Sequence, residues 1–218
     1  QKKAAQFQAP DGVEVVLTGQ SEEQAETMSF LGTAMLVSLG LIFLILVFQF
    51  NSLSKPVIIL TEIIFSMIGV FLGYAITGMT VSTIMMGIGI VALAGIVVRN
   101  GILLVEFTDL LIEQGYNTWD AIVEAGKTRM TPVLLTACAA IFGLIPLAVG
   151  LNIDFEKLLT TGNPHLFFGG DSVAFWGPLS WTMIFGLSFA TFLTLILVPA
   201  MYLLTERAKI RWKRFTNR

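Results

Sequence analysis

The chain has 218 residues, of which 55% are hydrophobic and 13% are charged, and its formal net charge is −2 at pH 7. A soluble domain carries about 25% charged residues, so much of this surface must face something other than water. High hydrophobicity argues against a disordered chain, and a single cysteine argues against a disulfide framework. Nucleic-acid binding is disfavoured because the 13 Lys and Arg residues are outnumbered by 15 Asp and Glu residues. The sequence therefore predicts an integral membrane protein.

Residues 1–29 are typical of a soluble segment that precedes the first apolar run. Pro10-Asp11-Gly12 is a turn signal, and Val13–Leu17 is a short run rich in β-forming residues. A strand that short is not stable alone in water, so it must pair with a part of the protein outside this sequence. We therefore interpret the chain as a fragment of a larger protein.

Five apolar runs are long enough to cross a membrane, since about 20 apolar residues span the hydrocarbon. The uncharged run between Glu62 and Arg99 is too long for one helix, and the turn-like cluster Thr77–Thr80 divides it. We predict an all-α membrane protein whose bundle covers residues 30–207, followed by a basic tail over 208–218. The expected helices are 30–50, 56–76, 81–107, 131–151 and 178–204.

The positive charges predict the orientation of the bundle. If the N-terminus lies outside, nine of the 13 Lys and Arg residues fall on the cytoplasmic side, as the positive-inside rule requires. The opposite orientation places the basic tail outside. Trp176 and Trp181, near the outer end of the last span, are typical of interfacial anchors. We expect an external N-terminus and a cytoplasmic C-terminus.

Arg99 and Asn100 interrupt the apolar third span. An arginine at the centre of a membrane helix costs about 2.5–3.5 kcal/mol on insertion scales, so it is rarely there by accident. The alternative is a side chain that reaches the cytoplasmic interface. Arg99 is, however, about eight residues from the inner end of the span, or roughly 12 Å. We interpret Arg99 as a functional residue.

The spacing of polar residues predicts a seam between the third and fourth spans. Arg99 and Glu106 are two turns apart on one helix, and Arg129 and Thr136 have the same spacing on the next, antiparallel helix. If Glu106 meets Arg129 near the cytoplasmic side, Arg99 meets Thr136 about 10 Å deeper. Alternatively, Thr136 bonds to its own helix, Arg129 is a positive-inside anchor and Glu106 is an interfacial carboxylate.

Small residues in the spans indicate close helix packing. Gly69 and Gly73 form a small-xxx-small pair, and Ala139 and Gly143 repeat the pattern in the fourth span. Cys138 is expected to be a buried core residue. The spans contain no nucleophile paired with a base and no set of metal ligands, so we predict neither an enzyme nor a bound cofactor.

Three segments resemble the C-terminal transmembrane part of the resistance–nodulation–division (RND) efflux permeases, the AcrB-like pumps. In chain order they are GQSEEQAETMSFLGTAMLVSLGLIFLILVFQFNSLSKP, GIVVRNGILLVEF and RMTPVLLTACAAIFGLIPLA. The resemblance covers roughly Gly12 to Arg207. It implies that the five spans are the last five of twelve helices. Residues 1–29 would then end a periplasmic porter-type α/β domain.

The resemblance implies proton-driven export of hydrophobic or amphiphilic compounds, with the proton gradient as the energy source. In the family an aspartate pair on the fourth helix takes protons, and the Lys-Asn motif of the tenth helix falls on Arg99 and Asn100. The threonine of the eleventh helix falls on Thr136, and the arginine before its proline falls on Arg129. Arginine does not deprotonate in proteins, so Arg99 would be a fixed counter-charge and not a proton carrier.

The resemblance also implies partners and a location. The partners are the rest of the permease with its aspartate pair, two further copies in a homotrimer, a periplasmic adaptor, an outer-membrane channel and the lipid bilayer. The location is the inner membrane of a Gram-negative-type bacterium. Metal, lipid and protein exporters of the family share this scaffold and remain alternatives. A membrane anchor or assembly subunit without transport is a further alternative, although an anchor has no use for the charge of Arg99.

Overall fold

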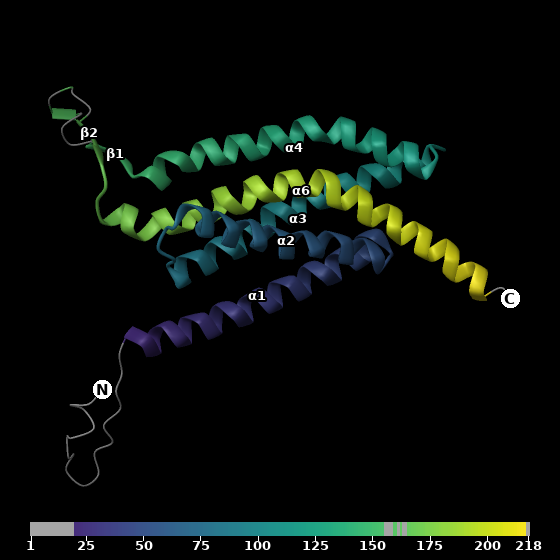
Figure 1. Ribbon diagram of the computed structural model, residues 1–218, viewed down its shortest axis with the longest axis horizontal. Coiled ribbons are helices and arrows are strands. Elements are labelled where there is room, and N and C mark those ends of the chain that lie inside the picture. Colours follow the sequence, from purple (N-terminus) through teal and green to yellow (C-terminus); the bar gives the residue numbers. More distant parts are fainter. Residues whose placement is uncertain (1–19, 155–158, 161, 163–164, 217–218) are drawn as a thin grey trace, which may run out of the picture.

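The structure, a computed structural model, describes residues 20–154, 159–160, 162 and 165–216. Over these residues the chain forms five long helices and one small two-stranded sheet (Figure 1). All five helices are long and apolar enough to cross a membrane, which confirms the predicted all-α membrane bundle. The predicted strand Val13–Leu17 lies outside the described residues. The elements are α1 (Gln20–Phe50), α2 (Ser54–Thr77), α3 (Thr83–Glu113), α4 (Thr118–Val149), β1 (Leu151–Asp154), β2 (His165–Phe168) and α6 (Asp171–Thr216).

The helices end where the sequence supplies a stop signal. Gly78 adopts a left-handed conformation with φ 65° and closes α2 with a hydrogen bond from its N–H to the carbonyl of Tyr74, so the predicted break at Thr77–Thr80 is confirmed. Gly150, with φ 80°, ends α4 in the same way. At the other end of α4, the side chain of Asn117 accepts from the N–H of Trp119.

Four helices extend well beyond the apolar runs that located them. Helix α1 begins at Gln20 and not at the expected residue 30, and α6 runs over Asp171–Thr216 and not 178–204, so part of the predicted basic tail is helical. The third apolar run was expected to end at residue 107, but α3 continues to Glu113, and α4 begins at Thr118, before the expected start at residue 131. An uncharged run marks the part of a helix that lipid can cover. The helix continues past the uncharged run, because a helix can contain charged residues where it lies outside the hydrocarbon.

The final helix, α6, lies at the centre of the bundle and packs against α2, α3 and α4 (Figure 1). Glycine allows the closest approach: a Cβ at Gly69 would overlap the side chain of Phe189, and one at Gly73 would overlap Phe185. The small-xxx-small pair of α2 therefore packs as predicted. Gly143 of α4, in contrast, has open space beside it, and Cys138 is exposed, so its predicted burial is wrong.

The buried core divides into two clusters along the bundle. One contains Ile59, Val105 and Val198, and the other contains Val70 and Leu187. Helix α1 packs mainly along α2 and α3 and diverges from the bundle toward its N-terminal end (Figure 1). Much of its apolar surface is uncovered within the described chain.

At the end of the bundle where α4 meets α6, a small hairpin closes the connection. Strands β1 and β2 are antiparallel, with Leu151 opposite Phe168. The side-chain amide of Asn152 donates to the carbonyls of Gly150 and Gly169, at 3.2 and 2.6 Å. The indole N–H of Trp181 donates to the carbonyl of Ala148 at 3.0 Å, which ties α6 to α4. The hairpin thus fixes the start of the central helix α6.

Candidate functional site

The Arg99–Asn100 pair of α3 places its two polar side chains on different faces of the helix. Arg99 is exposed, whereas Asn100 is 4% exposed, because neighbouring residues differ by about 100° around a helix. Arg99 makes no ion pair or hydrogen bond with any side chain among the described residues. Among the described residues the charge in the middle of α3 therefore has no ion-pair partner.

Among the described residues no hydrogen bond joins Arg99 to Thr136, the contact expected from the sequence. The hydroxyl of Thr136 donates to the carbonyl of Val133 on its own helix, at 3.0 Å. That bond to the same helix was the alternative drawn from the sequence. Thr136 is exposed, as is Arg99, so each side chain is available to a part of the protein outside the described residues. Their part in transport stays a prediction.

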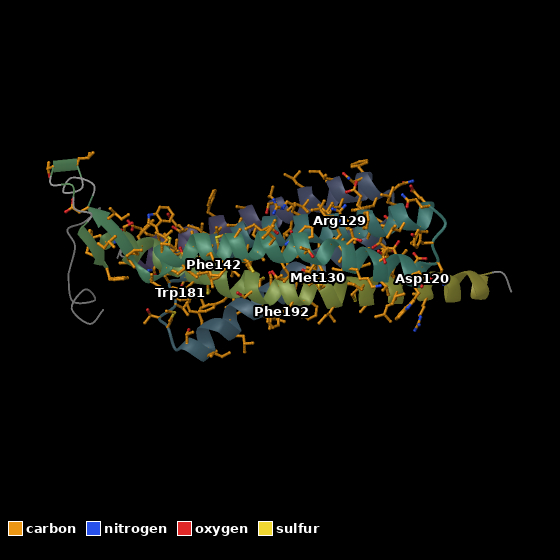
Figure 2. All side chains as sticks on the ribbon, turned by 90° about the horizontal axis from the view of Figure 1, so that it is seen from above. Asp120, Arg129, Met130, Phe142, Trp181 and Phe192 are labelled. Carbon is orange, nitrogen blue, oxygen red and sulfur yellow. The ribbon has the colours of Figure 1, made fainter. Side chains whose placement is uncertain are left out.

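The predicted ion pair between Glu106 and Arg129 is also absent among the described residues. The guanidinium of Arg129, labelled on α4 in Figure 2, lies 4.5 Å from the ring centroid of Phe107, the neighbour of Glu106. The antiparallel register therefore brings the expected levels of α3 and α4 together, but a cation–π contact replaces the ion pair. The Nε atom of Arg129 is buried and has no hydrogen-bond partner.

A polar cluster that the sequence did not indicate joins α2, α3 and α6. The ammonium of Lys55 donates to Oδ2 of Asp109 at 2.6 Å, and the hydroxyl of Tyr202 donates to Oδ1 at 2.6 Å. Both oxygens of one carboxylate are thus satisfied by neighbouring helices. The cluster opens onto a cavity of about 530 Å³ whose lining also includes Glu106 and Glu206. We name it the Asp109 cluster (Lys55, Asp109 and Tyr202).

The second intramembrane charge of interest is Glu62 of α2, for which the sequence indicated no role. Its side chain is 2% exposed, and the hydroxyl of Thr194 on α6 donates to Oε2 at 3.2 Å. The other oxygen, Oε1, is buried without a hydrogen-bond partner. Gly101 of α3 leaves room for this carboxyl, since a Cβ there would lie 2.7 Å from Oε1. The sequence offered one signal for this site: an acidic residue inside an apolar span, with a glycine on a neighbouring span.

The candidate polar groups therefore lie at two levels along α3. Near its C-terminal end a carboxylate is neutralised by Lys55 inside the chain. Deeper in the helix, Arg99 is exposed on one face and Glu62 contacts another face at Gly101. Ionisable side chains of this kind inside a membrane helix are costly, and they usually mark functional sites.

Comparison with known proteins assigns this architecture to a family. Residues 1–206 match the AcrB/AcrD/AcrF family. The chain is 37% identical over 98% of its length to the swarming motility protein SwrC of Bacillus subtilis, and 29% identical over 93% to the cobalt-zinc-cadmium resistance protein CzcA of Cupriavidus metallidurans. It spans 18% and 17% of the lengths of those two proteins.

The solved structures give the same result for the fold. The crystal structure of a heavy metal efflux pump superimposes with a TM-score of 0.72 and 28% sequence identity. The match covers 94% of this chain and 19% of the pump.

Proposed function

Because the chain belongs to the AcrB/AcrD/AcrF family of RND efflux permeases, we propose that it forms the C-terminal transmembrane helices of a longer permease that exports compounds by proton antiport. The observation that carries this proposal is the exposed Arg99 in the middle of the apolar helix α3, without a counter-charge among the described residues. A charge left in lipid is costly, so Arg99 requires a partner from another part of the permease. The carboxylates that the family resemblance implies meet that requirement.

The coupling that we propose is electrostatic. Arginine stays charged, so protonation acts on its partner carboxylates and not on Arg99. Two unit charges about 4 Å apart interact by about 4 kcal/mol at an effective dielectric constant of about 20. Loss of that attraction on proton binding would release α3 from the other half of the permease, and loss of the proton would restore it. Movement of α3 and its neighbours would then be passed to the substrate-binding domains.

For the substrate we propose hydrophobic or amphiphilic compounds, on the resemblance of the three sequence segments to AcrB-like pumps. A sequence identity of 28% over 78% of this chain to the toluene efflux pump TtgB of Pseudomonas putida supports this class. The similarity to CzcA and to a heavy metal efflux pump supports metal cations as the second candidate. Transport by the whole permease distinguishes the two substrate classes, since this chain covers less than a fifth of the length of each relative.

We further propose that the chain lies in the inner membrane, with an external N-terminus and a cytoplasmic C-terminus. The positive charges of the sequence support this orientation, and the family resemblance supports a homotrimer with a periplasmic adaptor and an outer-membrane channel. In this orientation the Asp109 cluster lies near the cytoplasmic side and the β1–β2 hairpin near the outer side.

The function is tested with the complete permease in liposomes. An imposed pH gradient should drive transport of a fluorescent amphiphile, and transport should be accompanied by measurable proton flow in the opposite direction. Cobalt ions serve as the comparison substrate. Transport of cobalt but not the amphiphile would favour the metal candidate, and transport that ignores the pH gradient would contradict proton antiport.

A further inference from the structure

Glu62 is enclosed by three helices at one level of the bundle. Its own helix α2 contributes the carboxyl, α6 contributes the hydroxyl of Thr194 at 3.2 Å, and α3 contributes the space beside Gly101. The residue is 2% exposed, which is as buried as the aliphatic core around it. A carboxyl in such surroundings needs compensation for the water it has lost.

That compensation is incomplete within the described chain. Oε2 receives the hydroxyl of Thr194, but Oε1 is buried and has no partner. The charged groups of the surrounding helices do not pair with Glu62: Lys55 contacts Asp109 about two turns away, and Arg99 and Glu106 are exposed. On α6, the charged side chains with described positions lie toward its two ends. An unpaired buried carboxylate is strongly unfavourable, and a proton is the simplest group that removes its charge.

We propose that Glu62 is a proton-binding site of the C-terminal helices. In the step, Oε1 forms one O–H bond with a proton from water, and the carboxylate becomes a neutral carboxylic acid. Oε2 keeps its hydrogen bond from Thr194. The reverse step breaks the O–H bond and returns the proton to water. This site is separate from the aspartate pair that the family resemblance implies, because it lies within this chain.

The position of Glu62 suggests how its proton affects the rest of the permease. Gly101 follows Arg99 by two residues, so the two lie about 200° apart around α3. Glu62 therefore contacts the face of α3 roughly opposite to Arg99. Release of the proton would place a negative charge behind the helix that presents Arg99 to its partner. This consequence rests on the proposed function, whereas proton binding itself does not.

The same three helices also carry the Asp109 cluster and its cavity. The Asp109 cluster joins α2, α3 and α6 about two turns from Glu62, and it opens onto the cavity of about 530 Å³.

The test is infrared difference spectroscopy of the complete permease over a range of pH, with isotope-labelled glutamate carboxyl groups. We expect a C=O stretching band of a protonated glutamic acid that is lost in Glu62→Gln and retained in the control Glu113→Gln, which removes an exposed carboxyl. Thr194→Val should move the same band to higher wavenumber, because the carbonyl loses its donor. The valine variant keeps the carboxyl and covers the case in which Glu62→Gln does not fold.

The outcomes separate this inference from the proposed function. A wild-type protein that transports with proton counterflow, yet has no Glu62-dependent C=O band at any pH and a Thr194→Val spectrum identical to it, overturns the inference alone. A Glu62-dependent band in a folded protein that moves no substrate upholds the inference and counts against the proposed function.

Discussion

Charged residues lie at two levels along α3, and the two levels differ in whether partners are present within the described chain. At the lower level, the carboxylate of Asp109 accepts from Lys55 and from Tyr202, both at 2.6 Å. About three turns earlier, Arg99 is exposed without an ion pair, and Glu62 contacts the helix with one oxygen unsatisfied. The Asp109 cluster therefore joins three helices, whereas Arg99 and Oε1 of Glu62 have no such partner among the described residues.

This difference shows that the role of a charge inside a membrane protein depends on the groups that contact it. A charge that is paired within the chain contributes to the packing of the helices. Unsatisfied charges persist where they interact with something outside the chain or change their protonation. The predictions below test that distinction by removing groups at each level and by measuring stability and transport separately.

The largest effect on stability is expected at Gly101, beside Glu62. Gly101→Ala places a Cβ 2.7 Å from Oε1 of Glu62 and should lower the free energy of unfolding by about 1–3 kcal/mol, as overpacking does. Gly95→Ala on the same helix is the matched control, since nothing lies near its Cβ position. Unfolding in detergent by heat or denaturant measures both.

A double-mutant cycle tests whether contact with Glu62 causes the loss of stability in Gly101→Ala. In the Glu62→Ala background the carboxyl that meets the new methyl group is gone, so Gly101→Ala should cost less there, with a coupling of about 0.5–3 kcal/mol. Equal costs in both backgrounds would show that Glu62 does not lie against Gly101.

A smaller loss is expected at the lower level. Lys55→Met leaves the half-buried carboxylate of Asp109 without its cation and should lower stability by about 1–2 kcal/mol, the range of a hydrogen bond to a charged group reduced for partial exposure. Lys127→Met breaks the exposed pair with Glu124 and should change stability by well under about 1 kcal/mol. If the two lysine variants unfold alike, the Asp109 cluster does not hold the helices together.

The smallest effect is expected at the contact between α3 and α4. Phe107→Leu removes the aromatic face beneath Arg129 and keeps an apolar side chain, so it should cost about 0.5–1 kcal/mol. The same substitution in an Arg129→Met background should cost less. A loss that is unchanged in that background would mean that Phe107 acts through packing and not through the cation.

Much of the fold follows from the sequence because uncharged runs and turn residues are local signals. The break at Gly78 and the close helix packing at Gly73 were both predicted from neighbours in sequence, although the sequence did not name α6 as the partner helix. The longer extent of α3, to Glu113, was missed because polar turns outside the lipid have no such signal. The exposed position of Cys138 was missed because hydrophobicity does not say which face of a lipid-covered helix is buried.

The site was predicted only in part, for a geometric reason. Arg99 was identified because a charge in an apolar run is visible in sequence, but its facing depends on how α3 rotates against its neighbours. The hydroxyl that satisfies Glu62 comes from Thr194, on the last helix, and no local pattern connects them. The pairing of Lys55 with Asp109 likewise depends on the packing of α2 against α3.

The central claim is that the charge of Arg99 serves a partner outside the described chain and not the stability of this bundle. The direct measurement is proton-driven transport by the complete permease in liposomes, with Arg99→Ala compared to Arg99→Lys and with unfolding measured on the same preparations. We predict that Arg99→Ala abolishes transport while its unfolding stays close to that of the wild type, and that Arg99→Lys retains part of the activity. Wild-type transport by folded Arg99→Ala would contradict the account.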